Sequence, residues 1–327
     1  MLKKMINAAQ IELEIIPLDP LLIKSGLATV GGVDMSFVRT WHTGESEEPF
    51  IPGSSIKGMI RAYAEKICRS LKDQPVPVCL PYAKPDEKIQ GESGQASCGL
   101  RFEKLKKKNS VIPSHDIYKH SCPACRLFGS HFYIGRLATS DAYLTETFKA
   151  TEKPVLEIRD GVAIDRITGG ARAKAKYDLE VLTRGEFDTS ISIRNFERWQ
   201  MGLMGLIFRD MIQGQLRLGF GKSRGLGRFT INIKSFVLSY YHKKVSDFKG
   251  IAALCENERQ AYGFFQEKTS ETASLENCQN NGLRFDYDIT QKWEDIIKPG
   301  VSDFIDYIDS NNWPDSIENY CQQENNQ

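Results

Sequence analysis

The chain has 327 residues, of which 41% are apolar, enough for one large domain or two smaller ones with a hydrophobic core. The formal net charge of +1 identifies no partner by itself. Residues 233–327 hold 9 Lys/Arg against 16 Asp/Glu, a net −7, so residues 1–232 carry +8. A basic first part favours a polyanionic partner there, and ordinary surface variation is the alternative.

No secretory signal or membrane span is expected. Gln10, Glu12 and Glu14 interrupt any apolar segment near the start. The chain also lacks an apolar run of about 18–20 residues, the length that crosses a bilayer. We therefore expect a cytoplasmic protein, whose eight cysteines are metal ligands or buried thiols rather than disulfides.

The first expected elements are a strand and a helix separated by a loop. Over residues 10–17 apolar residues alternate with polar ones, which predicts a half-buried strand. After a polar, glycine-rich loop, the segment from Ile51 opens a helix in which Ser54 or Ser55 caps the first turn. Helical spacing places a buried face at Ile56, Ile60, Tyr63 and Ile67, and leaves Lys57, Arg61 and Lys66 off that face.

The middle of the chain predicts an insertion, a hairpin and a second helix. The expected elements are an irregular region over 71–130, a strand over 135–143, a protruding hairpin region over 155–195, a helix over 198–211, a glycine-rich loop over 219–227 and a strand over 228–236. This order indicates an α+β, ferredoxin-like fold, with residues 1–240 as the core.

The composition changes after about residue 240, where Gln, Asn, Asp and Glu become more frequent. The helical signals over 293–297 and 304–308 are short. We expect residues 241–327 to form an accessory, acidic helical extension, with residues 322–327 disordered.

Four cysteines form a candidate metal site, two of them in a Cys-Pro-Ala-Cys turn: Cys79, Cys98, Cys122 and Cys125. Zinc prefers four thiolate or imidazole ligands in a tetrahedron, and such a turn supplies two. A segment without its own core gains folding free energy from the metal. His115 and His120 are alternative ligands, and the alternative for the first two cysteines is simple burial.

The glycine-rich loop over 219–228 matches no nucleotide-binding motif. Leu216 stands where the phosphate-binding loop of nucleotide hydrolases needs a glycine, and Arg224 stands where the dinucleotide motif needs one. Approachable backbone amides beside Lys222, Arg224 and Arg228 suit a phosphodiester backbone bound without sequence preference. The alternative is a tight turn that needs positive φ angles.

Asp34 follows Gly31-Gly32-Val33, and we expect its carboxylate to be exposed. Such a group can assist attack by a 2′-hydroxyl, bind a divalent metal or orient a scissile phosphate. Alone, a loop aspartate is more often a turn residue. His42 is a nearby candidate acid or base, with a structural role as the alternative.

The hairpin region contains Ile164-Asp165-Arg166-Ile167, followed by Arg172, Lys174 and Lys176. Basic residues on a projecting hairpin can hold a nucleic-acid backbone while apolar residues insert between bases. A solvated, charged hairpin is the alternative.

Together these segments resemble one family, the RAMP superfamily, whose members form the backbone of type III CRISPR effector complexes. Residues 32–34 and 50–61 look like its amino-terminal signature, which includes Ile-Pro-Gly-Ser-Ser-Ile-Lys-Gly. The other matching segments are 122–130 (similar to the zinc-knuckle motif), 163–166 and 177–181 (the thumb hairpin) and 219–227 (the closing glycine-rich loop). The match is ordered and runs over about residues 10–235.

The resemblance implies an RNA-recognition-motif-like core that packs head to tail with other RAMP and effector-complex subunits along a guide RNA. The thumb then distorts the guide–target duplex, while base pairing selects the sequence. Asp34 matches the aspartate that target-cleaving members require, and cleavage is implied to need Mg²⁺ or another divalent ion. The expected RNA-binding residues are Lys24, Ser54, Ser55, Lys57, Arg61, Arg166, Lys222, Arg224 and Arg228.

We therefore expect an endoribonuclease subunit that binds guide RNA and cleaves complementary target RNA in an antiviral ribonucleoprotein complex. The alternative is an architectural subunit of the same kind of complex that binds RNA without cutting it. A stand-alone repeat-processing nuclease is less favoured, since that branch lacks the zinc knuckle. A zinc hydrolase is least favoured, because a four-thiolate site leaves no position for water.

Overall fold

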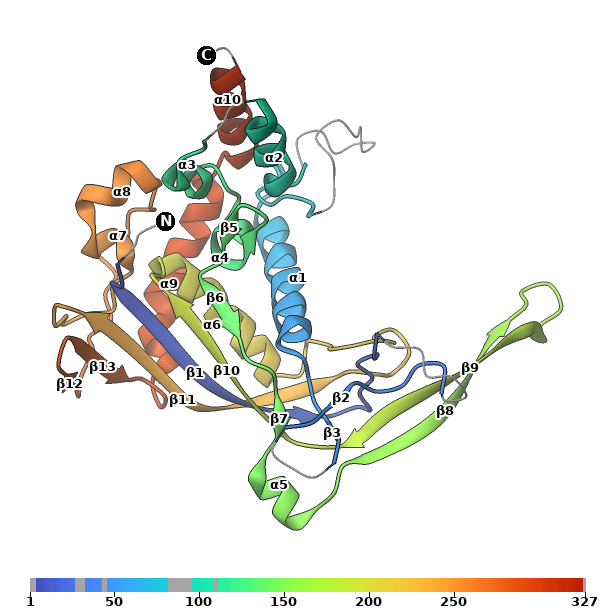
Figure 1. Cartoon of the computed structure of the whole chain (residues 1–327). Coiled ribbons are helices and arrows are strands. Elements are labelled where there is room, and N and C mark those ends of the chain that lie inside the picture. Colours follow the sequence, from blue (N-terminus) through green and yellow to red (C-terminus); the bar gives the residue numbers. More distant parts are fainter. Residues whose placement is uncertain (1–3, 27–32, 43–45, 82–95, 109–110, 326–327) are drawn as a thin grey trace.

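The computed structural model describes residues 4–26, 33–42, 46–81, 96–108 and 111–325, and its fold is mixed α+β around one antiparallel sheet (Figure 1). The strand order is β12-β13-β11-β1-β10-β6, and β7 pairs with β10. The strands are β1 (Asn7–Pro17), β6 (Leu137–Thr139), β7 (Tyr143–Leu144), β10 (Phe187–Arg194), β11 (Phe229–Tyr241), β12 (Gln279–Asn281) and β13 (Arg284–Asp288).

Strand β1 lies at the centre of the sheet, between β10 and β11. Its alternate residues Ala9, Ile11, Leu13 and Ile15 are at most 1% exposed, whereas Glu12 is exposed on the other face. The predicted half-buried strand is confirmed, and it begins three residues earlier than expected.

Helices α1 (Gly53–Leu71) and α6 (Arg198–Ile212) follow the predicted positions and lie against the sheet (Figure 1). On α1, Ile56 and Ile60 are fully buried, and Tyr63 and Ile67 are partly buried. Helix α6 is buried over most of its circumference rather than on one face, because α9 (Trp293–Ser310) packs on its other side.

The extension after residue 240 is joined to the core. Strand β13 pairs with β11, and β12 pairs with β13, so the extension lengthens the sheet. Its helices are α7 (Ile251–Leu254), α8 (Glu256–Tyr262), α9 and α10 (Trp313–Asn325). The two short helical signals form one 18-residue helix that continues through Pro299. Residues 322–325, expected to be disordered, continue α10, whose Trp313 and Ile317 are buried.

The region 71–130 is less irregular than predicted. It holds α2 (Cys98–Lys108), α3 (Ser114–Lys119), α4 (Pro123–Phe128) and the first of the two short strands β4 (Gly129–Ser130) and β5 (Tyr133–Ile134). The single strand expected over 135–143 is divided into β6 and β7. The reason is that Ala142 between them pairs with Ile51, just before α1.

A two-stranded hairpin, β8 (Val155–Ile164) with β9 (Ala171–Arg184), projects from one end of the sheet (Figure 1). It follows α5 (Glu146–Thr151) and lies near the short pair β2 (Arg39–Thr40) and β3 (Glu48–Pro49). The hairpin is shorter than the region expected over 155–195, because β10 belongs to the central sheet.

Candidate nucleic-acid interface

Strand β9 is the place where segments distant in sequence meet. The loop that holds the candidate aspartate pairs with it through a parallel bridge between Met35 and Leu179. The glycine-rich loop reaches it through Arg224, whose guanidinium donates a hydrogen bond to the hydroxyl of Tyr177. Three of the motifs singled out in the sequence therefore lie together on the inner half of the hairpin.

Asp34 is exposed at this junction, as expected. Its Oδ2 accepts a hydrogen bond of 3.1 Å from the main-chain N–H of Asp178 on β9. The glycines Gly31 and Gly32 lie outside the described residues. Because the bond fixes only one carboxylate oxygen, the other oxygen of Asp34 is available to a ligand.

Two further carboxyl groups, which the sequence analysis missed, lie beside Asp34. Asp160 of β8 and Asp178 of β9 are direct cross-strand partners. The neighbouring Asp160 carboxyl raises the pKa of Asp178 above its ordinary value, and Asp178 together with Lys176 lowers the pKa of Asp160. Nothing in the local sequence marks this pair, since it depends on the strand register.

The glycine-rich loop is a tight turn as well as a basic one. Gly219 and Gly227 have φ angles of 80° and 86°, and a Cβ on either would lie 2.2 or 2.1 Å from a carbonyl oxygen. Only glycine fits such positions. The loop is held by main-chain bonds from Phe220 to Leu22 and from Gly227 to Pro20, so it borders the segment that precedes the Asp34 loop.

The basic side chains of this loop point to solvent: Lys222, Arg224 and Arg228 are all exposed. The pKa of Lys222 is lowered, first by partial burial and then by the nearby charge of Lys66 on α1. Two like charges this close indicate a surface that a polyanion would stabilise. Lys24, on the neighbouring segment, is also exposed.

The start of α1 differs from the prediction in its capping. Neither Ser54 nor Ser55 caps the helix; Pro52 is the N-cap residue and has no side-chain cap. Instead, Asp141 from the β6–β7 connection accepts a 2.7 Å hydrogen bond from the Gly53 amide. The serine hydroxyls are thereby left out of the capping of the first turn, where anionic ligands bind favourably.

Lys57 and Arg61 on α1 contact protein atoms. The ammonium of Lys57 donates to the Leu137 carbonyl at 3.0 Å, and burial followed by the Arg61 charge lowers its pKa. The guanidinium of Arg61 donates to Glu65 Oε1 at 2.9 Å, to the Gly129 carbonyl at 3.0 Å and to the Cys125 thiol at 3.5 Å. An RNA contact by Arg61 would therefore compete with these bonds.

The outer half of the hairpin exposes apolar side chains. Val162, Ile164 and Ile167 are 47%, 56% and 97% exposed. Asp165 Oδ1 accepts the amides of Ile167 and Thr168, so the tip is an ordered turn with Arg166 exposed beside it. An ordered, protruding apolar tip next to a cation suits insertion into a base stack.

The open face of the sheet is unsuited to base stacking. In many RNA-binding sheets aromatic side chains on that face stack on bases. Here, along the described central strands, that face carries Glu12, Glu14 and Asp188 among Ser and Asn side chains, and its Lys234 is paired with Glu14 and Asp188. The exposed cations described above lie instead on α1, the glycine-rich loop and the hairpin.

His42 is exposed, and its ring stacks on Tyr143 with a centroid distance of 3.6 Å. Tyr143 in turn stacks on Phe50 at 6.1 Å. Within the described residues, no hydrogen bond or ring contact joins His42 to Asp34, and the contact that the geometry gives His42 is the stacking on Tyr143.

The four cysteines of the predicted metal site come together. All four are buried, and their sulfur atoms lie within 4.8 Å of one another. The Cys79–Cys125 and Cys79–Cys122 separations are 3.6 and 3.7 Å. A tetrahedron with zinc–sulfur bonds of about 2.3 Å has sulfur–sulfur edges of about 3.8 Å, so the cluster fits zinc.

The alternative ligands are excluded from this cluster. His120 donates or accepts at Ser316, 2.8 Å away, and stacks on Tyr320. His115 lies 3.6 Å from Asp116. Cys79 and Cys98 are buried, and both share the cluster, which favours the metal site over simple burial. Zinc here would hold α4 and the start of α2 together.

A sequence model of the RAMP superfamily matches residues 18–230, about two thirds of the chain. The chain belongs to the RAMP superfamily. Membership implies a CRISPR-associated, RNA-binding subunit that works with RNA and with other subunits of a complex. A comparison with curated proteins gave no match.

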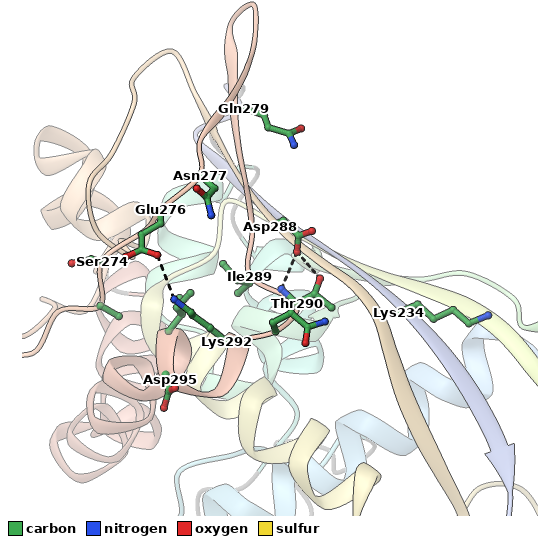
Figure 2. Close-up of a pocket in the computed structure, with 13 residues that line it drawn as sticks. Lys234, Ser274, Glu276, Asn277, Gln279, Asp288, Ile289, Thr290, Lys292 and Asp295 are labelled. Atoms are coloured by element: carbon green, nitrogen blue, oxygen red, sulfur yellow. Dashed lines mark hydrogen bonds and ion pairs between the residues drawn. The ribbon is translucent and has the colours of Figure 1, made fainter.

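The extension of this RAMP protein lies outside the matched residues and has a pocket of about 660 Å³ between β11, residues 273–279 and the start of α9 (Figure 2). Its charges are largely paired: Lys292 lies 3.4 Å from Glu276, and Asp288 accepts two hydrogen bonds from Thr290. The pocket is therefore not part of the basic surface. None of the helices in the described ranges is long and apolar enough to cross a membrane.

Proposed function

We propose that this RAMP protein binds guide RNA as a backbone subunit of a type III CRISPR complex and cleaves complementary target RNA with Asp34. The observation that carries the proposal is the meeting of Asp34, the hairpin and the glycine-rich loop on β9. An exposed carboxylate therefore lies beside the basic loop and the hairpin, which supports the proposal.

In this proposal the guide backbone follows the glycine-rich loop and the start of α1. Its phosphates contact exposed cations and hydroxyls, which bind backbone without reading sequence. The proposed contacts are Lys24, Ser54, Ser55, Lys222, Arg224 and Arg228, with Arg166 at the hairpin tip. Lys57 and Arg61 enter only if RNA displaces their protein partners.

The chemistry follows from an exposed carboxylate with one oxygen already fixed. Asp34 accepts the proton of a target 2′-hydroxyl as the 2′ oxygen bonds to the adjacent phosphorus and the bond to the 5′ oxygen breaks. The products are a 2′,3′-cyclic phosphate and a 5′-hydroxyl, whose proton comes from water.

No group of three or more carboxylates that could hold magnesium is present in the part of the chain that the structure describes. Among the described residues, the cysteines alone form a group of three or more ligating side chains of the kind a metal needs. We therefore assign no step to magnesium and make it a variable of the test below.

The sheet order supports a ferredoxin-like core made of β1, α1, β6, β10, α6 and β11. Strands β11, β1, β10 and β6 are neighbours in that order, with one helix after the first strand and one after the third. The hairpin, the cysteine region and the extension are then insertions and additions to this unit.

The test compares cleavage of labelled target RNA by guide-loaded complexes that carry wild-type protein, Asp34→Ala or Asp309→Ala, with and without magnesium. Asp309 is an exposed carboxylate on α9 and is the matched control. We expect Asp34→Ala to bind target normally and to lose one or more cuts. If every cut survives in that variant, Asp34 is not the catalytic group.

A non-cutting, architectural role is the second candidate, and one observation favours it. The Asp34 carboxylate already accepts the Asp178 amide, which is what a purely structural loop residue does. On this alternative Asp34→Ala changes the stability of the loop but none of the cuts.

A further inference from the structure

Glu180 on β9 binds the Asp34 loop with both of its carboxylate oxygens. Oε2 accepts a hydrogen bond of 2.9 Å from the main-chain N–H of Phe37. Oε1 lies 2.5 Å from Nη2 of Arg39, and the two side chains are 14% and 28% exposed. Both oxygens of this partly buried carboxylate are therefore bonded, and the contact with Arg39 is charge-assisted.

Main-chain bonds attach the same loop to the same strand. The Met35 amide donates to the Asp178 carbonyl at 3.1 Å, and the Glu180 amide donates to the Met35 carbonyl at 3.0 Å. With the Asp34–Asp178 bond, successive residues of the loop are attached to successive residues of β9. The other border of the loop is the segment around Ile23, whose carbonyl accepts the Val38 amide.

We propose that Glu180 is a positioning residue for Asp34, which keeps the loop over residues 34–39 attached to the hairpin so that the hairpin sets the direction of the Asp34 carboxylate. The inference rests on the proposed function, since it assigns Glu180 a part in cleavage. Asp34 moves with the element that engages the guide–target duplex, rather than with the central sheet.

The Glu180 contact is buried at the Phe37 amide. Phe37 is 1% exposed, so removing the Glu180 oxygen takes away the acceptor of an N–H in a buried position. The loop would then rotate to find another acceptor, and Asp34 is only three residues away. A displacement of about 1 Å at a reacting group can cost about 100-fold in rate.

Two substitutions of Glu180 distinguish its hydrogen bond to the Phe37 amide from its ion pair with Arg39. Glu180→Gln keeps an oxygen for the Phe37 amide and loses the charge opposite Arg39, whereas Glu180→Ala loses both. We expect single-turnover cleavage to fall about 10-fold in the first and about 100-fold in the second, with target affinity within about twofold of wild type. Glu157→Gln breaks the exposed Glu157–Arg159 pair on β8 and is the control with unchanged cleavage.

Amide hydrogen exchange over residues 35–39 gives a readout independent of activity. In the guide-loaded complex we expect faster exchange in Glu180→Ala, intermediate exchange in Glu180→Gln and wild-type exchange in Glu157→Gln. Wild-type exchange and wild-type cleavage in Glu180→Ala would overturn the inference.

The two proposals fail in different ways. If Asp34→Ala keeps every cut while Glu180→Ala loosens the loop, the catalytic proposal fails and Glu180 only anchors the loop. If Asp34→Ala abolishes cuts while Glu180→Ala cuts normally, Asp34 is catalytic and Glu180 does not position it. A loss of target binding in Glu180→Ala also counts against positioning, because the predicted effect is on rate alone.

Discussion

Gly202 of α6 and Gly300 of α9 meet backbone to backbone. A Cβ added to Gly202 would lie 2.0 Å from the Gly300 carbonyl oxygen, and one added to Gly300 would lie 2.5 Å from the Arg198 carbonyl oxygen. The two helices therefore cross at a separation that side chains would prevent. This crossing joins the extension to the part of the chain that carries the family match.

Gly202→Ala should destabilise the protein, because the new methyl group has only rigid backbone to meet. Overpacking of this kind costs about 1–3 kcal/mol, and the absence of a flexible neighbour places this site toward the upper end. Thermal unfolding followed by circular dichroism measures the loss. Gly58→Ala on α1 is the control: a Cβ there meets nothing within 4 Å, so the variant should gain about 0.5–1 kcal/mol. Equal changes in unfolding temperature for Gly202→Ala and Gly58→Ala would contradict the close approach of the two helices.

Local patterns predicted those elements that depend on local order. Alternation located β1, helical spacing located α1 and α6, and the Cys-Pro-Ala-Cys turn led to the cysteine cluster. For the strand and the helices, the sequence pattern and the element it predicts lie in the same segment. For the cluster, the residue type is informative, because cysteine has few roles in such a protein. The hairpin was predicted as well, although its carboxyl limit was placed too far along the chain.

Relationships between segments were not predictable in the same way. Glu180 resembles any polar residue on a half-exposed strand, and only the parallel bridge between Met35 and Leu179 gives it two partners. Asp141 replaced the expected serine cap because the β6–β7 connection passes the start of α1. Gly202 gave no sign of a helix crossing until its partner, nearly 100 residues later, was placed beside it.

Replacing Cys122 and Cys125 together by serine should abolish metal binding and lower the unfolding temperature. The two residues supply half of the sulfur cluster, and they lie at the N-cap and within the buried helix α4, where a bound metal would add to the packing. We expect about one zinc ion per chain in the wild type and none in the variant, measured by elemental analysis after gel filtration. Cys278→Ser, outside the cluster, should keep the metal. Zinc retained in the double variant would refute the site.

Lys222→Ala with Arg224→Ala should weaken RNA binding without unfolding the protein, because both side chains are exposed. Each lost phosphate contact reduces the slope of log affinity against log salt by about 0.7–0.9, so the double variant should lose at most about 2 from that slope. Fluorescence anisotropy with a guide-length RNA at several salt concentrations measures it. Lys243→Ala with Lys244→Ala removes the same charge from an exposed turn outside the family match. An identical slope change in both double variants would mean that net charge alone is responsible.

Glu267 should make stability fall as the pH rises toward neutrality. Burial raises its pKa from 4.5 to about 7, although Arg198 lies 3.7 Å away, because that arginine makes its close contacts with Asp303. A folded-state pKa above the unfolded one means that the native protein binds the proton more tightly. The stabilisation is complete below pH 4.5 and is lost as the pH rises through 7, a change of about 3 kcal/mol.

Glu267→Gln keeps an oxygen for the Gly250 amide and carries no charge. Relative to wild type, it should be about equally stable at pH 4.5 and more stable at pH 7.5 in urea unfolding. Glu294→Gln, an exposed site on α9, should track wild type at both pH values. A Glu267→Gln difference that does not grow with pH would show that the buried carboxyl group is not the source.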